Sequence, residues 1–139
     1  MSNTDASFDV VVVGGGPAGL AAAIALSQSG ARTALVARQA PYADNRTTAL
    51  LGGSVDFLDE LGVWQMCSDR AAGLKAMRLV DDTGRLIRAP EVRFVADEIG
   101  LDLFGYNIAN AVLVEALERR AAETEGLVRI AEDAESVQS

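Results

Sequence analysis

The residues best placed to do chemistry form a glycine-rich turn with the spacing G-x-G-x-x-G. The turn reads Gly14-Gly15-Gly16-Pro17-Ala18-Gly19. It follows the β-branched run 10–13 and precedes a helix predicted over residues 20–28. At such a junction the free N–H groups and the positive end of the helix dipole are available to an anion. The context therefore predicts a turn that binds the diphosphate of a dinucleotide.

Each glycine of the motif has a physical role in that prediction. Gly14 permits the tight turn, and Gly16, which lacks a side chain, lets a diphosphate approach the backbone. Gly19 lets the helix pack close to the preceding strand. Pro17 lies near the first helical position, where its missing N–H is not needed. The alternative is a glycine-rich turn that serves packing alone.

Composition excludes several kinds of function. The 139 residues carry a net charge of −8, which argues against a nucleic-acid partner. There is no histidine and only one cysteine, Cys67, so a Ser-His-Asp triad, a His-ligated or Cys-x-x-Cys metal site and an internal disulfide are excluded. The N-terminal residues lack a signal-peptide core, and the apolar stretch 10–26 is interrupted by glycines and a proline. These features predict a soluble protein of a reducing compartment, with no transmembrane segment and no metal.

Hydrophobic periodicity predicts the other elements of the chain. It predicts strands at 33–37 and 127–131, helices at 49–61 and 107–122, a loop at 38–46, a connection at 69–73, a hairpin of strands 77–80 and 86–89 around the turn 81–84, and a tail at 132–139. Strands 9–13, 33–37 and 127–131 are apolar enough to lie parallel in one sheet. The predicted fold class is therefore α/β.

Three stretches of the chain resemble one family. Residues 9–38 look like the adenine-dinucleotide half of the FAD-dependent aromatic-ring hydroxylases, the group typified by p-hydroxybenzoate hydroxylase. The second stretch, 36–63, is similar to the strand, loop, arginine and helix of that family and contains Asn45-Arg46-Thr47-Thr48-Ala49-Leu50. The third is most similar to the branch that hydroxylates polyprenylated phenols in ubiquinone synthesis, and it reads Gly105-Tyr106-Asn107-Ile108-Ala109-Asn110.

The resemblance implies a fold and a set of site residues. It implies a Rossmann-like FAD/NAD(P)-binding domain over 1–139 with an incomplete parallel sheet, and a hairpin around 76–95 that belongs to a substrate region. The turn would bind the FAD diphosphate through Gly14, Gly15, Gly16, Pro17, Ala18 and Gly19. Arg46 would reach the same diphosphate, Arg38 and Gln39 would lie near the adenosine, and Tyr106 and Asn107 would approach the flavin chain. The alternatives are surface charges at Arg38 and Arg46, and an N-cap of the following helix at Asn107.

The sequence departs from the family in two places. Ala37 stands where the family carries an acid that accepts hydrogen bonds from the adenosine ribose, and this loss is expected to weaken FAD binding by about 1–3 kcal/mol. It also admits NADP as a ligand, because Arg38 is placed to accommodate a 2′-phosphate. Nothing after Asn110 resembles the family's later Gly-Asp motif. The expectation is an N-terminal portion of a hydroxylase that is inactive by itself.

Three functions follow as hypotheses. The first is the FAD-binding portion of an NAD(P)H-dependent monooxygenase that hydroxylates an aromatic ring, with a ubiquinone-pathway polyprenyl phenol as substrate. The second is a stand-alone NADP-binding module without catalysis, and the third is a remnant without a ligand. For the first, the expected location is cytoplasmic, with peripheral association at the inner membrane as the family alternative. Substrate identity and oligomeric state are left open.

Overall fold

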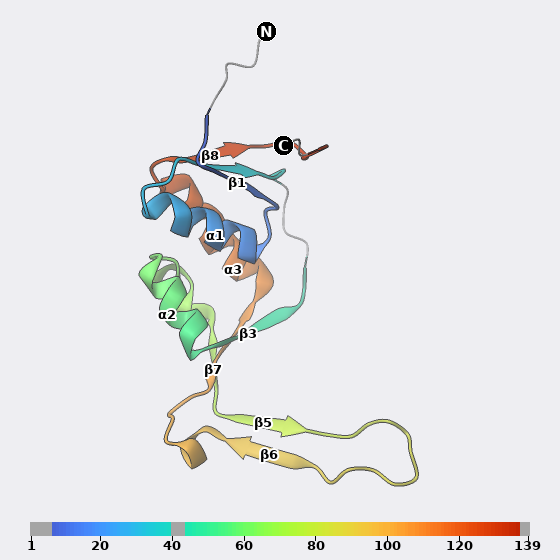
Figure 1. The fold of residues 1–139 in the computed structure, drawn as a ribbon. Coiled ribbons are helices and arrows are strands. Elements are labelled where there is room, and N and C mark those ends of the chain that lie inside the picture. The colour runs from blue at the N-terminus through green and yellow to red at the C-terminus, as the bar shows by residue number, and fades with distance from the viewer. Residues whose placement is uncertain (1–6, 40–43, 137–139) are drawn as a thin grey trace.

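The chain folds into a parallel sheet, a second antiparallel sheet and a projecting hairpin (Figure 1). The computed structural model describes residues 7–39 and 44–136. Its strands and helices are β1 (Val10–Val13), α1 (Pro17–Gln28), β2 (Thr33–Val36), β3 (Thr47–Leu51), α2 (Gly52–Glu60), β4 (Ala72–Leu74), β5 (Ala76–Leu79), β6 (Val92–Val95), β7 (Gly105–Ala109), α3 (Asn110–Glu123) and β8 (Leu127–Ile130). Short 3-10 helices cover Trp64–Met66, Ser68–Arg70 and Ala96–Ile99.

The first sheet has the order β1-β2-β8 and is parallel throughout. Figure 1 shows α1 and α3 packed together beneath it. Leu20 and Ile24 of α1, Leu35 of β2 and Leu117 of α3 are almost completely buried in the core between these layers. The predicted α/β class with a parallel sheet is confirmed, and α1 begins at Pro17, three residues before the predicted start.

The antiparallel sheet has the order β3-β7-β4 and corrects the helix predicted over 49–61. The periodic leucines at its start belong to β3: Leu50 is buried and Leu51 is exposed, which is the alternation of a strand. The helix begins only at Gly52. Two β-branched residues, Thr47 and Thr48, favour the strand before it, a signal that the apolar spacing concealed.

The central strand of this sheet, β7, contains the first three residues of the helix predicted over 107–122, so that prediction is wrong at its start. Asn107 is opposite Ala49 of β3 and Ala72 of β4, so it lies in the middle of β7. α3 begins at Asn110, and its N-cap is Ala109. The prediction that Asn107 caps the helix is therefore wrong. Pairing with two neighbouring strands, one of which was expected to be a connection, outweighed the local helical pattern.

The hairpin exists, but its second strand differs from the prediction. β5 pairs with β6 from Ala76 opposite Val95 to Leu79 opposite Val92, so residues 86–89 lie in the connection. The Asp81 carboxylate accepts hydrogen bonds from the backbone N–H groups of Thr83 (3.1 Å) and Ala89 (2.9 Å), which closes a wide loop instead of a tight turn. Figure 1 shows this loop extending away from both sheets.

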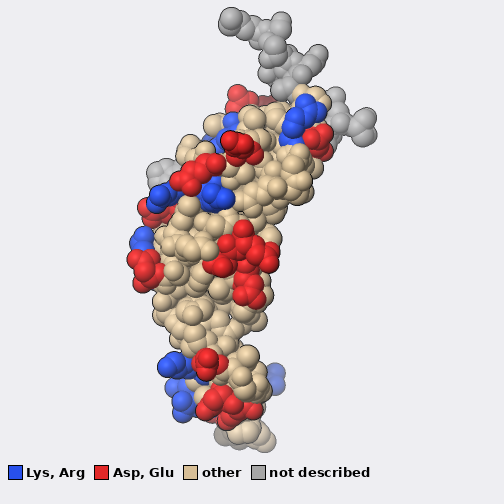
Figure 2. Space-filling view, turned by 90° about the vertical axis from the view of Figure 1, so that its left-hand side faces the viewer, with Lys and Arg blue, Asp and Glu red and all other residues tan. Residues whose placement is uncertain are grey.

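Charge is distributed without a continuous basic surface on the face shown in Figure 2, as far as the described residues go. There the acidic side chains gather midway along the molecule, and the basic ones are interspersed with acidic ones. This distribution agrees with the net charge of −8. Within the described ranges, the helices are all too short or too polar to cross a membrane. Cys67 is buried, and burial raises the pKa of its thiol.

Candidate cofactor-binding site

The glycine-rich turn joins the end of β1 to the start of α1. Gly14 has φ +114°, a conformation that favours glycine, and its N–H donates to the carbonyl oxygen of Val36 at 3.0 Å. This bond ties the turn to the end of β2. The turn therefore lies at the carboxyl edge of the parallel sheet, where open α/β sheets bind their ligands.

The helix end that follows the turn is open to an anion. Gly16 is the N-cap of α1, without a side-chain hydrogen bond among the described residues, and the first turn contains no acid. A Cβ built on Gly16 would have no described atom within 4 Å. The backbone N–H groups at this end can accordingly face a diphosphate, and the residues present fit that group.

Gly15 and Gly19 are constrained by close neighbours, unlike Gly16. A Cβ on Gly19 would overlap the carbonyl oxygen of Gly14, so only glycine lets α1 start this close to the turn. A Cβ on Gly15 would lie 2.9 Å from the Cβ of Ala37. The turn thus packs directly against the residue that replaces the family's acid.

Arg46 lies just before β3 in a hydrogen-bonded group that was not foreseen. Its Nε and Nη2 donate to the two carboxylate oxygens of Asp44, at 2.9 Å and 2.8 Å. The Arg46 side chain is 82% exposed and that of Asp44 only 13%. The Asp44 carboxylate also accepts from Asn110 Nδ2 at 3.0 Å, and Thr48 Oγ1 donates to Asn110 Oδ1. The Arg46 side chain is therefore held by Asp44, and Asp44 is in turn bonded to Asn110, the first residue of α3.

The same group shifts the acidity of Asp44. Hydrogen bonds from the Arg46 guanidinium, then from Asn110 and from the Arg46 N–H, hold the pKa of the Asp44 carboxyl far below its ordinary value of 3.8. Asp44 is therefore ionised at neutral pH and can keep orienting Arg46. Asn110 closed the third family-like stretch, but no role was assigned to it from the sequence.

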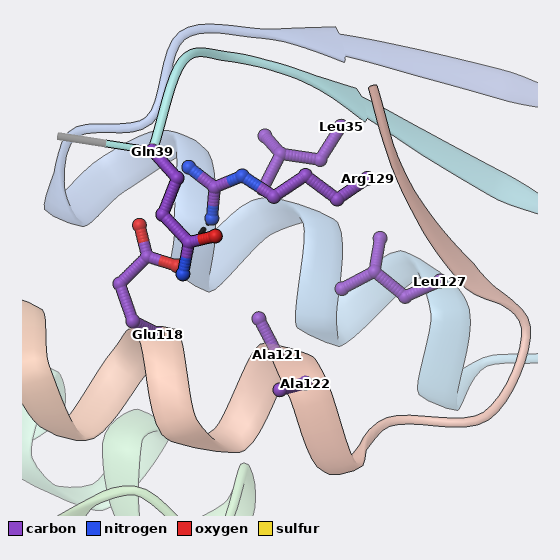
Figure 3. Close-up of a pocket in the computed structure, with 7 residues that line it drawn as sticks. All are labelled: Leu35, Gln39, Glu118, Ala121, Ala122, Leu127 and Arg129. Carbon is purple, nitrogen blue, oxygen red and sulfur yellow. Dashed lines mark hydrogen bonds and ion pairs between the residues drawn. The ribbon is translucent and has the colours of Figure 1, made fainter. Parts of the chain in front are cut away.

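Arg38 and Gln39 follow the end of β2 and have different neighbours. The Arg38 guanidinium is paired with the carboxylate of Asp133, with Nε and Oδ1 2.8 Å apart. That pairing disfavours binding of a 2′-phosphate by Arg38. Such binding was the reason to consider NADP as a ligand. Gln39 lines a cavity of about 230 Å³ together with Glu118 and Arg129, whose polar groups lie close together in Figure 3.

Tyr106 and Asn107 lie on β7, in the antiparallel sheet. The ring of Tyr106 packs against Trp64, with ring centroids 5.1 Å apart and planes tilted by 57°. Asn107 is half-buried between β3 and β4. Both residues therefore come from a different sheet than the turn, and their approach to a flavin stays a prediction.

An apolar groove of about 470 Å³ lies between the start of α1 and the segment formed by β3 and α2. The first turn of α1 contributes Pro17 and Ala18, and β3 and α2 contribute Leu50, Gly53 and Phe57. The start of α1 and the start of α2 therefore line the same groove. Such a groove can cover a flat apolar group beside a bound phosphate.

Comparison with known proteins decides which dinucleotide this geometry serves. The family described as "FAD binding domain" matches residues 7–139. The chain belongs to this family. Its cofactor is FAD, as the resemblance to the flavin-dependent hydroxylases predicted.

One curated relative is named for ubiquinone biosynthesis, and another for the hydroxylation of demethoxyubiquinol. The rat (Rattus norvegicus) protein "Ubiquinone biosynthesis monooxygenase COQ6, mitochondrial" is 27% identical over 98% of this chain and 30% of its own length. The 3-demethoxyubiquinol 3-hydroxylase of Escherichia coli (strain K12) is 33% identical over 82% of this chain and 30% of its own length. The chain thus spans less than a third of these relatives, and both support the predicted branch of the family.

Solved structures share the fold. The p-nitrophenol 4-monooxygenase PnpA of Pseudomonas putida DLL-E4 superposes with a TM-score of 0.72, at 19% identity, over 94% of this chain and 33% of that one. The flavin-dependent monooxygenase PieE, solved with FAD and substrate, gives a TM-score of 0.69 at 24% identity, over 91% of this chain and 24% of that one. The FAD-binding fold predicted from the sequence is confirmed.

Proposed function

We propose that this chain forms the FAD-binding region of an NAD(P)H-dependent monooxygenase that hydroxylates an aromatic ring. The observation that carries the proposal is an FAD-family match over 7–139 whose turn is open to a diphosphate at Gly16. The relative named for ubiquinone biosynthesis and the relative named as a demethoxyubiquinol hydroxylase support a polyprenylated phenol as substrate. Because such a substrate partitions into membranes, peripheral contact with the inner membrane is part of the proposal.

The proposed roles follow from the geometry of each residue. The N–H groups of the turn 14–19 bind the diphosphate, and Gly16 keeps the space above them clear. Arg46, oriented by Asp44, adds a planar guanidinium that suits phosphate oxygens. Arg38 and Gln39 border the adenosine, and Asn107 borders the flavin chain. When bound, FAD supplies the redox and oxygen chemistry, and the protein supplies binding and orientation.

The projecting hairpin has a separate proposed role. We assign residues 76–95 to the substrate region, because β5 and β6 pair with each other and belong to neither of the two larger sheets. Their connection carries Leu86 and Ile87 almost fully exposed to solvent. Exposed apolar side chains of this kind are typical of a surface that contacts an apolar partner or substrate.

The activity is tested with the complete translation product of the reading frame that encodes this chain. That protein, loaded with FAD and given NADH or NADPH, should add one oxygen atom to a polyprenylated phenol, as measured by mass spectrometry. A Gly16→Val version is the matched control and should give no product. FAD binding without a hydroxylated product from any phenol tested, simple or polyprenylated, would contradict the proposal.

A further inference from the structure

Arg129 is an unexpected residue in the parallel sheet. It lies in β8, where a strand covered by helices is normally apolar, and its side chain is only 20% exposed. Its guanidinium extends toward the end of β2, where Nε donates to the carbonyl oxygen of Ala37 at 3.3 Å and Nη2 to that of Arg38 at 3.2 Å. Figure 3 shows this side chain beside Gln39 and Glu118.

Glu118 of α3 provides the opposite charge. Its carboxylate accepts a hydrogen bond from Arg129 Nη1, and its side chain is 24% exposed. A half-buried guanidinium is stable only when its charge is paired and its N–H groups have acceptors. One arginine therefore links three elements: β8, α3 and the end of β2.

The linked segment lies directly against the glycine-rich turn. A Cβ on Gly15 would be 2.9 Å from the Cβ of Ala37 and 3.4 Å from Arg129 Nη2. The Arg38 carbonyl oxygen lies 3.9 Å from the same Cβ position, and Arg129 binds both this oxygen and that of Ala37 at the end of β2. Each carbonyl oxygen has two lone pairs, and a bond to Arg129 occupies one of them. A second acceptor site remains on each oxygen.

We propose that Arg129, braced by Glu118, positions the Ala37 and Arg38 carbonyls to accept hydrogen bonds from the ribose hydroxyls of the FAD adenosine. Backbone oxygens thereby take the role of the carboxylate that Ala37 lacks. The inference rests on the proposed FAD-binding role of the turn and specifies how the same site binds ribose. Arg129 acts through the backbone and is a positioning residue.

The test compares nucleotides that differ by one hydroxyl group. Calorimetric titration of the chain with ADP, 2′-deoxy-ADP and 3′-deoxy-ADP should give an affinity for ADP about 3- to 10-fold above that for at least one deoxy form, as a neutral hydrogen bond would. Arg129→Met should reduce ADP binding to the deoxy level, so that the ratio falls to about one. Arg129→Lys and Glu118→Gln should give intermediate ratios, because each keeps part of the link.

A matched control separates positioning from charge and from folding. Arg119→Met removes an exposed arginine of α3 that pairs with Glu123, and it should leave the ADP to deoxy-ADP ratio unchanged. Circular dichroism and thermal unfolding check that each variant folds. If Arg129→Met does not fold, the lysine and glutamine variants carry the test, because a merely structural role would not change the ratio in a folded variant.

The outcomes distinguish this inference from the proposed function. An unchanged ratio in the folded variants, or no preference for ADP in a wild-type chain that binds FAD, would overturn the inference alone. A wild-type chain that binds neither FAD nor ADP would overturn both.

Discussion

The glycine-rich turn and the Arg46 group are two halves of one proposed diphosphate site, and they are built differently. The turn is defined by backbone geometry within six consecutive residues, with Gly14 bonded to Val36 at 3.0 Å. The Arg46 group depends on side chains from distant parts of the chain, with Asp44 and Asn110 joined at 3.0 Å. Backbone N–H groups can be located from a local motif, whereas a side-chain contact depends on the assembled fold.

The largest effect on stability is expected at Gly19, where α1 packs against the glycine-rich turn. Gly19→Val places a side chain into the Gly14 carbonyl, so we expect the free energy of unfolding to fall by about 3 kcal/mol or more, with loss of FAD binding. Thermal unfolding followed by circular dichroism measures this. A variant as stable as wild type would show that α1 does not need its close approach to the turn.

The next largest effect is expected at Gly16, and it should change FAD binding without changing the fold. Gly16→Val meets no described atom within 4 Å and has an extended backbone with φ −76°, so the fold should survive. The side chain occupies the proposed phosphate site, and FAD affinity should fall by about a hundredfold or more, since several charge-assisted hydrogen bonds are lost. Fluorescence titration and circular dichroism together check this separation. Normal FAD binding would place the ligand elsewhere.

A smaller effect on FAD affinity is expected from changes to Arg46 and Asp44. Arg46→Ala should weaken FAD binding by about 1–3 kcal/mol, because one bidentate phosphate contact is lost. Asp44→Asn should change affinity in the same direction but less, since Arg46 loses its orienting charge. Arg70→Ala is the matched control: Arg70 is also exposed and paired with a carboxylate, that of Glu115. Equal effects of the two alanine variants would reduce Arg46 to a surface charge.

The smallest effect concerns pH. The pKa of Asp44 is depressed in the folded chain, so its stabilising contribution is complete above the ordinary value of 3.8 and is lost only as the pH falls through the lower folded value. Changing the pH from 7 to 5 should therefore leave the effect of Arg46→Ala on FAD affinity unchanged. Titrations at both values check this. If the effect of Arg46→Ala disappeared at pH 5, Asp44 would not be the group that orients Arg46.

The sequence predicted the glycine-rich turn, α1 and the parallel sheet better than it predicted the antiparallel sheet. The turn, α1 and the three parallel strands follow from glycine spacing and apolar runs. β3, β4 and β7 were not predicted, because each is stabilised by pairing between segments that lie far apart in the chain.

The site residues divide in the same way. Asp44, Asn110 and Glu118 received no role, because their contacts form only after β3, α3 and β8 have packed. Arg129 gave a signal that could have been used: a charged residue within an otherwise apolar run of a predicted parallel strand.

The most direct test of the central claim is a titration of the chain with FAD and, in parallel, with NADP. Ala37 has no side-chain acceptor for the ribose hydroxyls, so the expected FAD affinity is modest. It should still exceed the affinity for NADP, because Arg38 is already paired with Asp133. Tighter binding of NADP than of FAD would contradict the account.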